Sequence, residues 1–319
     1  MKNLYVIFDT NVYRDLTYGL TEHEARERFE KIKKAEKERG IFAGLSVVTA
    51  MELLAHLADK SDPAYELCKI AITAAGFHVL RDKKEVSYFL HPQLQLQNLI
   101  IGAYDENLMK KFEIIMEVVN FINIGPAEDY IIKFHEQIAE VKRLVALHEQ
   151  DFKTTIFNIL KGLDPTTTSW TAFANDRQKR KRTLKYLTDH HQEVLDLMAM
   201  GYVHKTLVAR NKQWARQEIA LAAIKVSDYF RTALMLHLAV FKKIIIGGFD
   251  MDNRKLNREN TIWDIYHLFC ITNGQIGGKD VIFVTAENWL HEISIESGLA
   301  DKILKVEDYL NKIGITLYN

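Results

Sequence analysis

The sequence predicts an α/β fold in which a parallel sheet is flanked by helices. Two short apolar segments, residues 4–8 and 281–284, contain the β-branched and aromatic residues typical of buried strands. The segments between them carry apolar residues mainly at helical spacing. Strands that alternate with helices favour a parallel sheet with helical crossovers. We therefore expect both ends of the chain to contribute to one sheet.

The first part of the chain alternates strand and helix. We expect a buried strand over Leu4–Phe8 and a charged, exposed helix over Glu22–Arg39 that ends at Gly40. A second strand is predicted over Ile41–Ser46, and an apolar helix over Val47–Leu57. This order is the one that a parallel sheet requires.

The middle of the chain is expected to be mostly helical. Residues 62–118 are predicted to be helical apart from a short strand candidate at Phe77–Leu80. A third strand is predicted at Val119–Ile124, followed by a long helix from Pro126 to about Asp151. Residues 152–248 are predicted to be helical as well.

A basic stretch marks an inserted subdomain. Residues 177–216 hold ten Lys or Arg residues and three acidic ones. We therefore expect three segments: the first part of the α/β core at 1–150, an all-helical basic insertion at 151–254, and the second part of the core at 255–319.

The end of the chain returns to the α/β pattern. The expected elements are a helix at Ile262–Ile271, a loop at Asn273–Asp280, a strand at Val281–Val284, helices at Trp289–Ser297 and Val306–Lys312, and a last strand at Ile313–Tyr318.

Composition excludes several classes of protein. The 42 basic and 42 acidic residues of the 319 cancel, so net charge does not indicate a polyanionic partner. Cys68 and Cys270 fit no zinc or redox spacing, and without a disulfide framework a reducing compartment is expected. The longest apolar run, 233–249, contains two lysines and is too short to span a bilayer. With no room for a signal peptide before residue 4, we expect a soluble cytoplasmic protein without a membrane partner.

Four acidic residues share a position in this pattern. Asp9 and Glu287 each follow a short apolar strand, whereas Glu52 and Asp264 each lie near the start of an apolar helix. In a parallel sheet these positions meet at one edge, and Asp264 joins them if its helix packs there. Clustered carboxylates repel one another unless they hold cations, and oxygen ligands favour Mg²⁺ or Mn²⁺. Such metals activate water for phosphodiester cleavage.

Alternatives exist for two of these residues. Asp9 or Thr10 could instead simply cap the next helix. Asp250, Asp252 or Asp228 could take the place of Asp264, although each of these three is better explained as a solvated surface acid.

Taken together, these segments resemble the PIN-domain nucleases over residues 1–60, 119–150 and 255–319. The resemblance rests on Phe8-Asp9-Thr10-Asn11, Ser46-x-x-Thr49-x-x-Glu52-Leu53, Ile122-Asn123-Ile124-Gly125-Pro126 before a helix, Asp264 with His267, and Val284-Thr285-x-Glu287.

The resemblance implies a Mg²⁺- or Mn²⁺-dependent endonuclease of single-stranded RNA, with DNA as a second substrate class. Because PIN-like domains often pair, a homodimer is a further candidate partner, as is an inhibitory protein. Two features depart from the family: the fourth acid is usually Asp, and the chain is about twice the usual length. The family's carboxylates would be Asp9, Glu52, Asp264 and Glu287, with Asn11 and Thr285 as polar support.

The basic insertion is the candidate nucleic-acid surface. Cations would bind phosphates, and the neighbouring aromatic residues Trp170, Phe173, Tyr186 and Trp214 would stack on bases. The alternative is a solvated helix face with its aromatic residues in the core. The candidate cations are Arg177, Lys179, Arg180, Lys181, Arg182, Lys185 and Lys212.

Two other functions compete with the nuclease. A phosphatase of the haloacid dehalogenase type also places an Asp after its first strand, but it needs a second Asp where this chain has Asn11. A catalytically weak PIN-like scaffold would bind nucleic acid or a protein without cleaving it. Retention of all four acids argues against this scaffold, and the replacement of Asp by Glu287 keeps it open.

Overall fold

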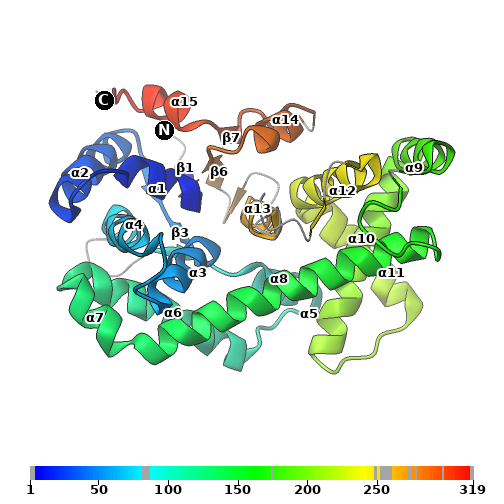
Figure 1. The fold of residues 1–319 in the computed structure, drawn as a ribbon, viewed down its shortest axis with the longest axis horizontal. Coiled ribbons are helices and arrows are strands. Elements are labelled where there is room, and N and C mark those ends of the chain that lie inside the picture. Colours follow the sequence, from blue (N-terminus) through cyan, green and yellow to red (C-terminus); the bar gives the residue numbers. More distant parts are fainter. Residues whose placement is uncertain are drawn as a thin grey trace. The chain divides into compact units, whose positions relative to one another are not determined.

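The protein is a mixed α/β chain that consists largely of helices and contains a small, mainly parallel sheet (Figure 1). Among the described residues, no helix is long and apolar enough to cross a membrane. The computed structural model describes residues 4–80, 87–173, 175–247, 250–251, 261–271, 275–276, 279–296 and 298–316.

The chain forms two compact units. The first comprises Met1–Gln95, Tyr104–Val145 and Cys270–Asn319, and the second comprises Leu96–Ala103 and Ala146–Phe269. The predicted division at residues 150 and 254 stays a prediction. Each unit is described by itself.

The main sheet of the first unit is built on strand β1 (Leu4–Phe8). Strand β2 (Ile41–Ala43) and strand β6 (Lys279–Val284) pair with β1 in parallel, on either side of it. Strand β7 (Ile303–Leu304) extends β6 in parallel, and β5 (Gln275–Ile276) pairs with β6 antiparallel. Thus the α/β class is confirmed, with an antiparallel edge that the sequence did not predict.

The predicted strand at 41–46 divides at Gly44. After β2, strand β3 (Leu45–Ser46) leaves the main sheet and pairs with β4 (Tyr88–Phe89). A Cβ atom at Gly44 would lie 2.3 Å from the Phe89 ring, so only glycine lets this ring pack against the backbone. The close approach of Phe89 therefore accompanies the change of partner strand.

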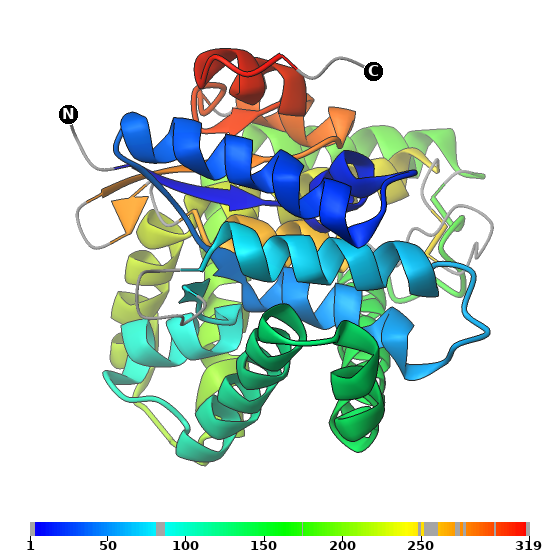
Figure 2. The same cartoon turned by 90° about the vertical axis from the view of Figure 1, so that its left-hand side faces the viewer.

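Helices pack around the sheet and enclose the hydrophobic core of the first unit. Helix α4 is central, because α1, α2 and α3 all pack against it (Figure 2). The predicted helices at 22–39, 47–57, 289–297 and 306–312 are confirmed within two residues at each end. The helices of this unit are α1 (Thr10–Thr17), α2 (Glu22–Glu38), α3 (Val47–Ala55) with the 3₁₀ turn His56–Ala58, α4 (Tyr65–His78), α6 (Glu106–Ile124), α7 (Ala127–Lys133), α14 (Asn288–Glu296) and α15 (Val306–Lys312). The unit also contains the start of α5 (Pro92–Ile101) up to Gln95 and of α8 (His135–Leu163) up to Val145.

The predicted third strand at Val119–Ile124 is wrong, because these residues form the last turns of α6. Phe112, Ile115, Val119 and Ile122 are all buried, and their spacing is that of one helix face. A short apolar run does not distinguish strand from helix, and here the preceding turns of helix continue through it. The PIN resemblance expects its third strand at Ile122–Ile124, and in the structure this motif is helical instead.

Three other expectations need correction. Helix α4 runs to His78, so Phe77–Leu80 is not a strand. The predicted long helix from Pro126 is interrupted at Phe134, between α7 and α8 (His135–Leu163). Ile313 caps the C-terminus of α15, and residues 314–316 are not in a strand. Tyr318, at the end of that last predicted strand, lies outside the described residues, as do 273–274 and 277–278 of the predicted loop.

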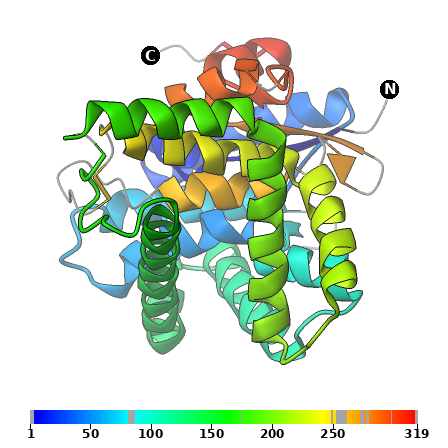
Figure 3. The same cartoon turned by 90° about the vertical axis from the view of Figure 1, so that its right-hand side faces the viewer.

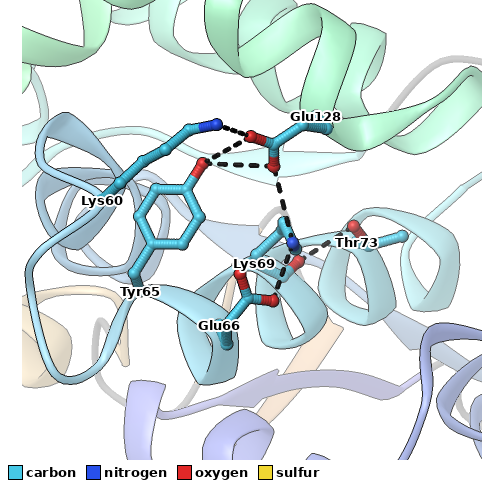
Figure 4. A network of polar contacts seen from close by, with 6 residues as sticks. All are labelled: Lys60, Tyr65, Glu66, Lys69, Thr73 and Glu128. Atoms are coloured by element: carbon cyan, nitrogen blue, oxygen red, sulfur yellow. Dashed lines mark hydrogen bonds and ion pairs between the residues drawn. The ribbon is translucent and has the colours of Figure 1, made fainter.

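A network of charged side chains joins α7 to α4 (Figure 4). Glu128 on α7 forms ion pairs with Lys60 and Lys69 and accepts a hydrogen bond from the Tyr65 hydroxyl at 3.3 Å. The contact with Lys60 lowers the pKa of Glu128, and burial together with Glu128 raises the pKa of Tyr65 to about 12. The network holds the short helix α7 against the core.

Every regular element among the described residues of the second unit is a helix, as predicted for residues 152–248, and turns or irregular segments at 164–173 and 211–215 separate these helices. Helix α12 packs against α9, α10 and α13, and α10 pairs with α11 (Figure 3). In its core the Phe269 ring packs edge-on against Tyr202 and at a tilt against Phe230. Its helices are the end of α5 (Pro92–Ile101), α8 from Ala146, α9 (Arg177–Asp189), α10 (His191–Ala209), α11 (Arg216–Tyr229), α12 (Arg231–Ile246) and α13 (Thr261–Phe269).

Candidate metal centre

Two predicted site residues, Asp9 and Thr285, directly follow adjacent parallel strands at the same edge of the sheet. Phe8 of β1 pairs with Val284 of β6, and the Asp9 amide donates to the Val284 carbonyl at 2.9 Å. On the other side of β6, the Thr285 amide donates to the Leu304 carbonyl at 3.1 Å. The backbone thus fixes Asp9 and Thr285 side by side at the carboxyl edge of the sheet.

The Asp9 carboxylate is buried and is held by Thr285. Asp9 is only 3% exposed, and its Oδ2 accepts a hydrogen bond of 2.8 Å from Thr285 Oγ1. Although Asp9 is the N-cap residue of α1, its side chain makes no capping hydrogen bond. The carboxylate is therefore not a helix cap, and the hydroxyl offsets part of the cost of burying it.

The Glu52 carboxylate comes from α3 and is held by Thr10. Thr10 Oγ1 donates to Glu52 Oε2 at 2.6 Å, and Glu52 is half-buried. The start of α3 is attached to the end of β1, since Thr49 Oγ1 donates to the Phe8 carbonyl at 3.3 Å. One carboxylate oxygen of Glu52 consequently lies within 4.8 Å of one of Asp9.

A third carboxylate, Glu287, follows β6 and is held by Asn11. Asn11 Nδ2 donates to Glu287 Oε1 at 2.9 Å, and the Glu287 amide donates to Thr285 Oγ1 at 3.1 Å. Two side-chain hydrogen bonds, Thr285 to Asp9 and Asn11 to Glu287, therefore connect the residues just after β1 to those just after β6. The turn after β6 is further fixed by His291, whose Nε2 contacts the Thr285 carbonyl at 3.2 Å.

The donor set fits a hard divalent cation. Mg²⁺ binds oxygen at about 2.1 Å, so two oxygens on one ion lie at most about 4.2 Å apart. The Asp9 and Glu52 oxygens lie within 4.8 Å of one another. The partners identified for the three carboxylates are Thr10, Asn11 and Thr285, all neutral. These hydrogen bonds orient the carboxylates, whose oxygens suit Mg²⁺ or Mn²⁺.

No family model matches the chain, and no curated protein or solved structure does either. The resemblance to PIN-domain nucleases therefore rests on the motifs alone.

The structure adds two residues to the predicted set. Thr10 was expected at most to cap a helix, and its position directly after Asp9 was the signal that could have indicated a role in the site. His291 had no such signal in the sequence, because its contact with Thr285 depends on how α14 begins after β6.

Asp264 and its rivals belong to the second unit, so the role of Asp264 as a fourth carboxylate stays a prediction. Asp264 is half-buried in the first turn of α13, between buried neighbours. Asp228 is exposed on α11, and Asp250 lies beside a polar pocket in the same unit. Asp252 lies outside the described residues.

The predicted nucleic-acid-binding cations lie on α9, except Lys212, which follows α10. Arg177, Lys181, Arg182, Lys185 and Lys212 are exposed, whereas Lys179 and Arg180 are half-buried. Lys179 forms an ion pair with Asp164, and Lys185 forms one with Asp189 at 2.8 Å.

Two of the four aromatic residues near these cations are buried, and Trp214 is half-buried. Trp170 and Phe173 are buried, as the core alternative expects, whereas Tyr186 is 40% exposed. The Tyr186 ring stacks on His190 with ring centres 4.7 Å apart. Nucleic-acid binding by this helix stays a prediction.

Proposed function

We propose that this protein is a PIN-like, metal-dependent endonuclease that cleaves phosphodiester bonds, foremost in single-stranded RNA. The observation that carries the proposal is the approach of the Asp9 and Glu52 carboxylates to within 4.8 Å at the carboxyl edge of the sheet. Each carboxylate accepts a hydrogen bond from a neutral hydroxyl. Two carboxylates at this separation repel one another, and a cation bound between them would relieve the repulsion.

Asp9 and Glu52 would hold Mg²⁺ or Mn²⁺, and Glu287 and Asp264 are proposed as further ligands. Such an ion supplies a Lewis acid that activates water and stabilises charge on the phosphate oxygens. Thr285 and Thr10 keep the carboxylate oxygens in position, and Asn11 does the same for Glu287. The exposed cations of α9 would attract the phosphates of the strand.

Cleavage of labelled single-stranded RNA and DNA tests this function. We expect cleavage with Mn²⁺ or Mg²⁺, none with EDTA, and a loss of at least about 100-fold in Asp9→Asn. The matched control is Glu30→Gln, which changes an exposed acid on α2 of the same unit and should cleave normally. Cleavage that persists in EDTA, or that Asp9→Asn retains, contradicts the proposed mechanism.

A binding measurement separates a metal site from catalysis. A metal at 100 times its dissociation constant stabilises the folded state by about 2.7 kcal/mol. Mn²⁺ should therefore raise the thermal midpoint of the unaltered protein and of Glu30→Gln, but not that of Asp9→Asn. Metal binding without cleavage would favour the scaffold, and hydrolysis of a small chromogenic phosphate ester without cleavage would favour the phosphatase.

A further inference from the structure

The second unit contains an apolar pocket of about 500 Å³. Side chains of helices α8, α9, α10, α12 and α13 line it, and these helices can be followed in Figure 3 from green through yellow to gold. Its volume lies in the range of roughly 300–1,000 Å³ typical of small-molecule sites. Most of the lining side chains are apolar, among them Phe152, Leu187, Val194, Met198 and Phe241.

Large apolar side chains are also exposed around the pocket. Ile159, Leu163, Tyr186 and Leu197 line it, yet they are 39%, 39%, 40% and 53% exposed. A cluster of exposed apolar side chains next to a cavity indicates a binding site, whereas isolated ones are ordinary.

One polar side chain lines this pocket with a buried nitrogen that has no partner. His237 on α12 is 5% exposed, and its Nδ1 lies 3.0 Å from the Tyr202 hydroxyl. Its ring stacks on Phe152 with centres 5.4 Å apart. Among the described residues, nothing hydrogen-bonds to His237 Nε2. An unsatisfied buried nitrogen is costly, so a ligand that pairs with it gains affinity.

Among the described residues that line the pocket, none presents an unpaired charge. Burial, with a smaller effect of the Lys205 cation, lowers the pKa of His237 to about 3, so the imidazole is neutral at physiological pH. Lys205 itself forms an ion pair with Asp151 at 2.6 Å. Tyr202 and Tyr266, which also line the pocket, keep their protons because burial raises the pKa of both.

The free nitrogen suits a hydroxyl group best. The Tyr202 hydroxyl can donate to Nδ1 or accept from it, so Nε2 is a donor in one tautomer and an acceptor in the other. A hydroxyl both donates and accepts, and it therefore pairs with either tautomer.

We propose that this pocket binds a neutral, largely apolar small molecule whose hydroxyl group pairs with His237 Nε2. The site lies wholly within the second unit, and it does not depend on the proposed nuclease function.

Binding of decan-1-ol to the full-length protein, measured by titration calorimetry, tests the proposal. We expect saturable binding of decan-1-ol at one site per chain. Decanoate should bind at least about tenfold more weakly, because burying its charged carboxylate in a neutral apolar pocket is costly. His237→Phe removes the ring nitrogens and should weaken the binding of decan-1-ol by about 3- to 10-fold. Failure of decan-1-ol to bind, or tighter binding of decanoate, overturns the proposal.

A second pair of variants tests the pocket without altering the histidine. Gly201 lines the pocket, and a Cβ placed on it would meet nothing within 4 Å, so the Gly201→Leu side chain starts in open space at the pocket. Gly162→Leu is the matched control, since Gly162 has the same open surroundings on α8 and does not line the pocket. Decan-1-ol affinity should fall at least about tenfold in Gly201→Leu alone. An equal change in the two variants, or none in either, overturns the proposal.

Discussion

At the scale of single residues, Thr285 has two functions in the candidate metal centre. Its hydroxyl donates a hydrogen bond to the Asp9 carboxylate and accepts one from the backbone amide of Glu287. Thr285 is fully buried, so water does not replace either bond when the hydroxyl is removed. The residue thus connects a buried carboxylate to the backbone of the turn after β6.

Thr285→Val should lower the free energy of unfolding by about 1–3 kcal/mol, because it leaves a buried carboxylate oxygen and a backbone amide without this partner. Urea denaturation measures the change. The matched control is Thr73→Val on α4, where an equally buried hydroxyl bonds a carbonyl of its own helix at 3.0 Å. That carbonyl keeps its helical amide partner, so Thr73→Val should lower the free energy of unfolding much less than Thr285→Val does. Equal losses in the two variants would contradict this role for Thr285.

At the scale of elements, a buried polar network joins four helices of the first unit. Glu36 on α2 contacts His78 Nε2 on α4 at 2.9 Å and accepts from the Tyr309 hydroxyl on α15 at 2.6 Å. The Tyr13 hydroxyl on α1 lies 3.0 Å from His78 Nδ1. All four residues are at most 2% exposed. Their hydrogen bonds fix how these helices pack beside the sheet.

This network predicts a loss of stability at alkaline pH. Burial, together with the nearby Glu36 carboxylate, raises the pKa of Tyr13 and of Tyr309 well above 10 in the folded state. The unfolded chain releases these protons near pH 10, so the stabilisation is complete below that pH and is lost as the pH rises above it. Each tyrosine contributes a slope of up to about 1.4 kcal/mol per pH unit.

Urea denaturation between pH 8 and pH 11 tests the slope. The double variant Tyr13→Phe/Tyr309→Phe is expected to be less stable at pH 8 but to lose stability less steeply above pH 10. Lysines and the other tyrosines titrate alike in both proteins, so the difference in slope reports on these two residues. Parallel curves would show that neither tyrosine is linked to folding.

At the scale of the whole molecule, charge is balanced in total but not in distribution. The chain has equal numbers of basic and acidic residues, yet α9 carries six cations over Arg177–Lys185. Any attraction for a polyanion must therefore come from local surfaces rather than from net charge.

The exposed cations of α9 should account for part of the salt dependence of RNA binding. Arg177→Ala/Lys181→Ala/Arg182→Ala should weaken binding of single-stranded RNA and reduce the slope of log affinity against log salt by about 2, near 0.7 per phosphate contact. Lys31→Ala/Lys34→Ala/Lys37→Ala on α2 removes the same charge from another exposed surface. Titrations at several salt concentrations compare the two. Identical slopes in both triple variants would rule out α9 as the RNA-binding helix.

The sequence by itself determined most helices and the strands β1 and β6, because periodicity and β-branched composition act over neighbouring residues. It also located Asp9 and Glu287 just after those strands. It failed at Val119–Ile124, where a short apolar run is compatible with strand or helix and the preceding turns of α6 decide. It also did not show that β3 leaves the main sheet after Gly44.

Only the tertiary structure decided which side chains meet. The bond from Thr10 to Glu52 joins residues 42 positions apart, and the bonds from Asn11 and Thr285 join residues 276 apart. The pocket beside His237 likewise depends on five helices packing together. Such pairings depend on strand register and helix packing over the whole chain, and neither is encoded in the pattern of any one segment.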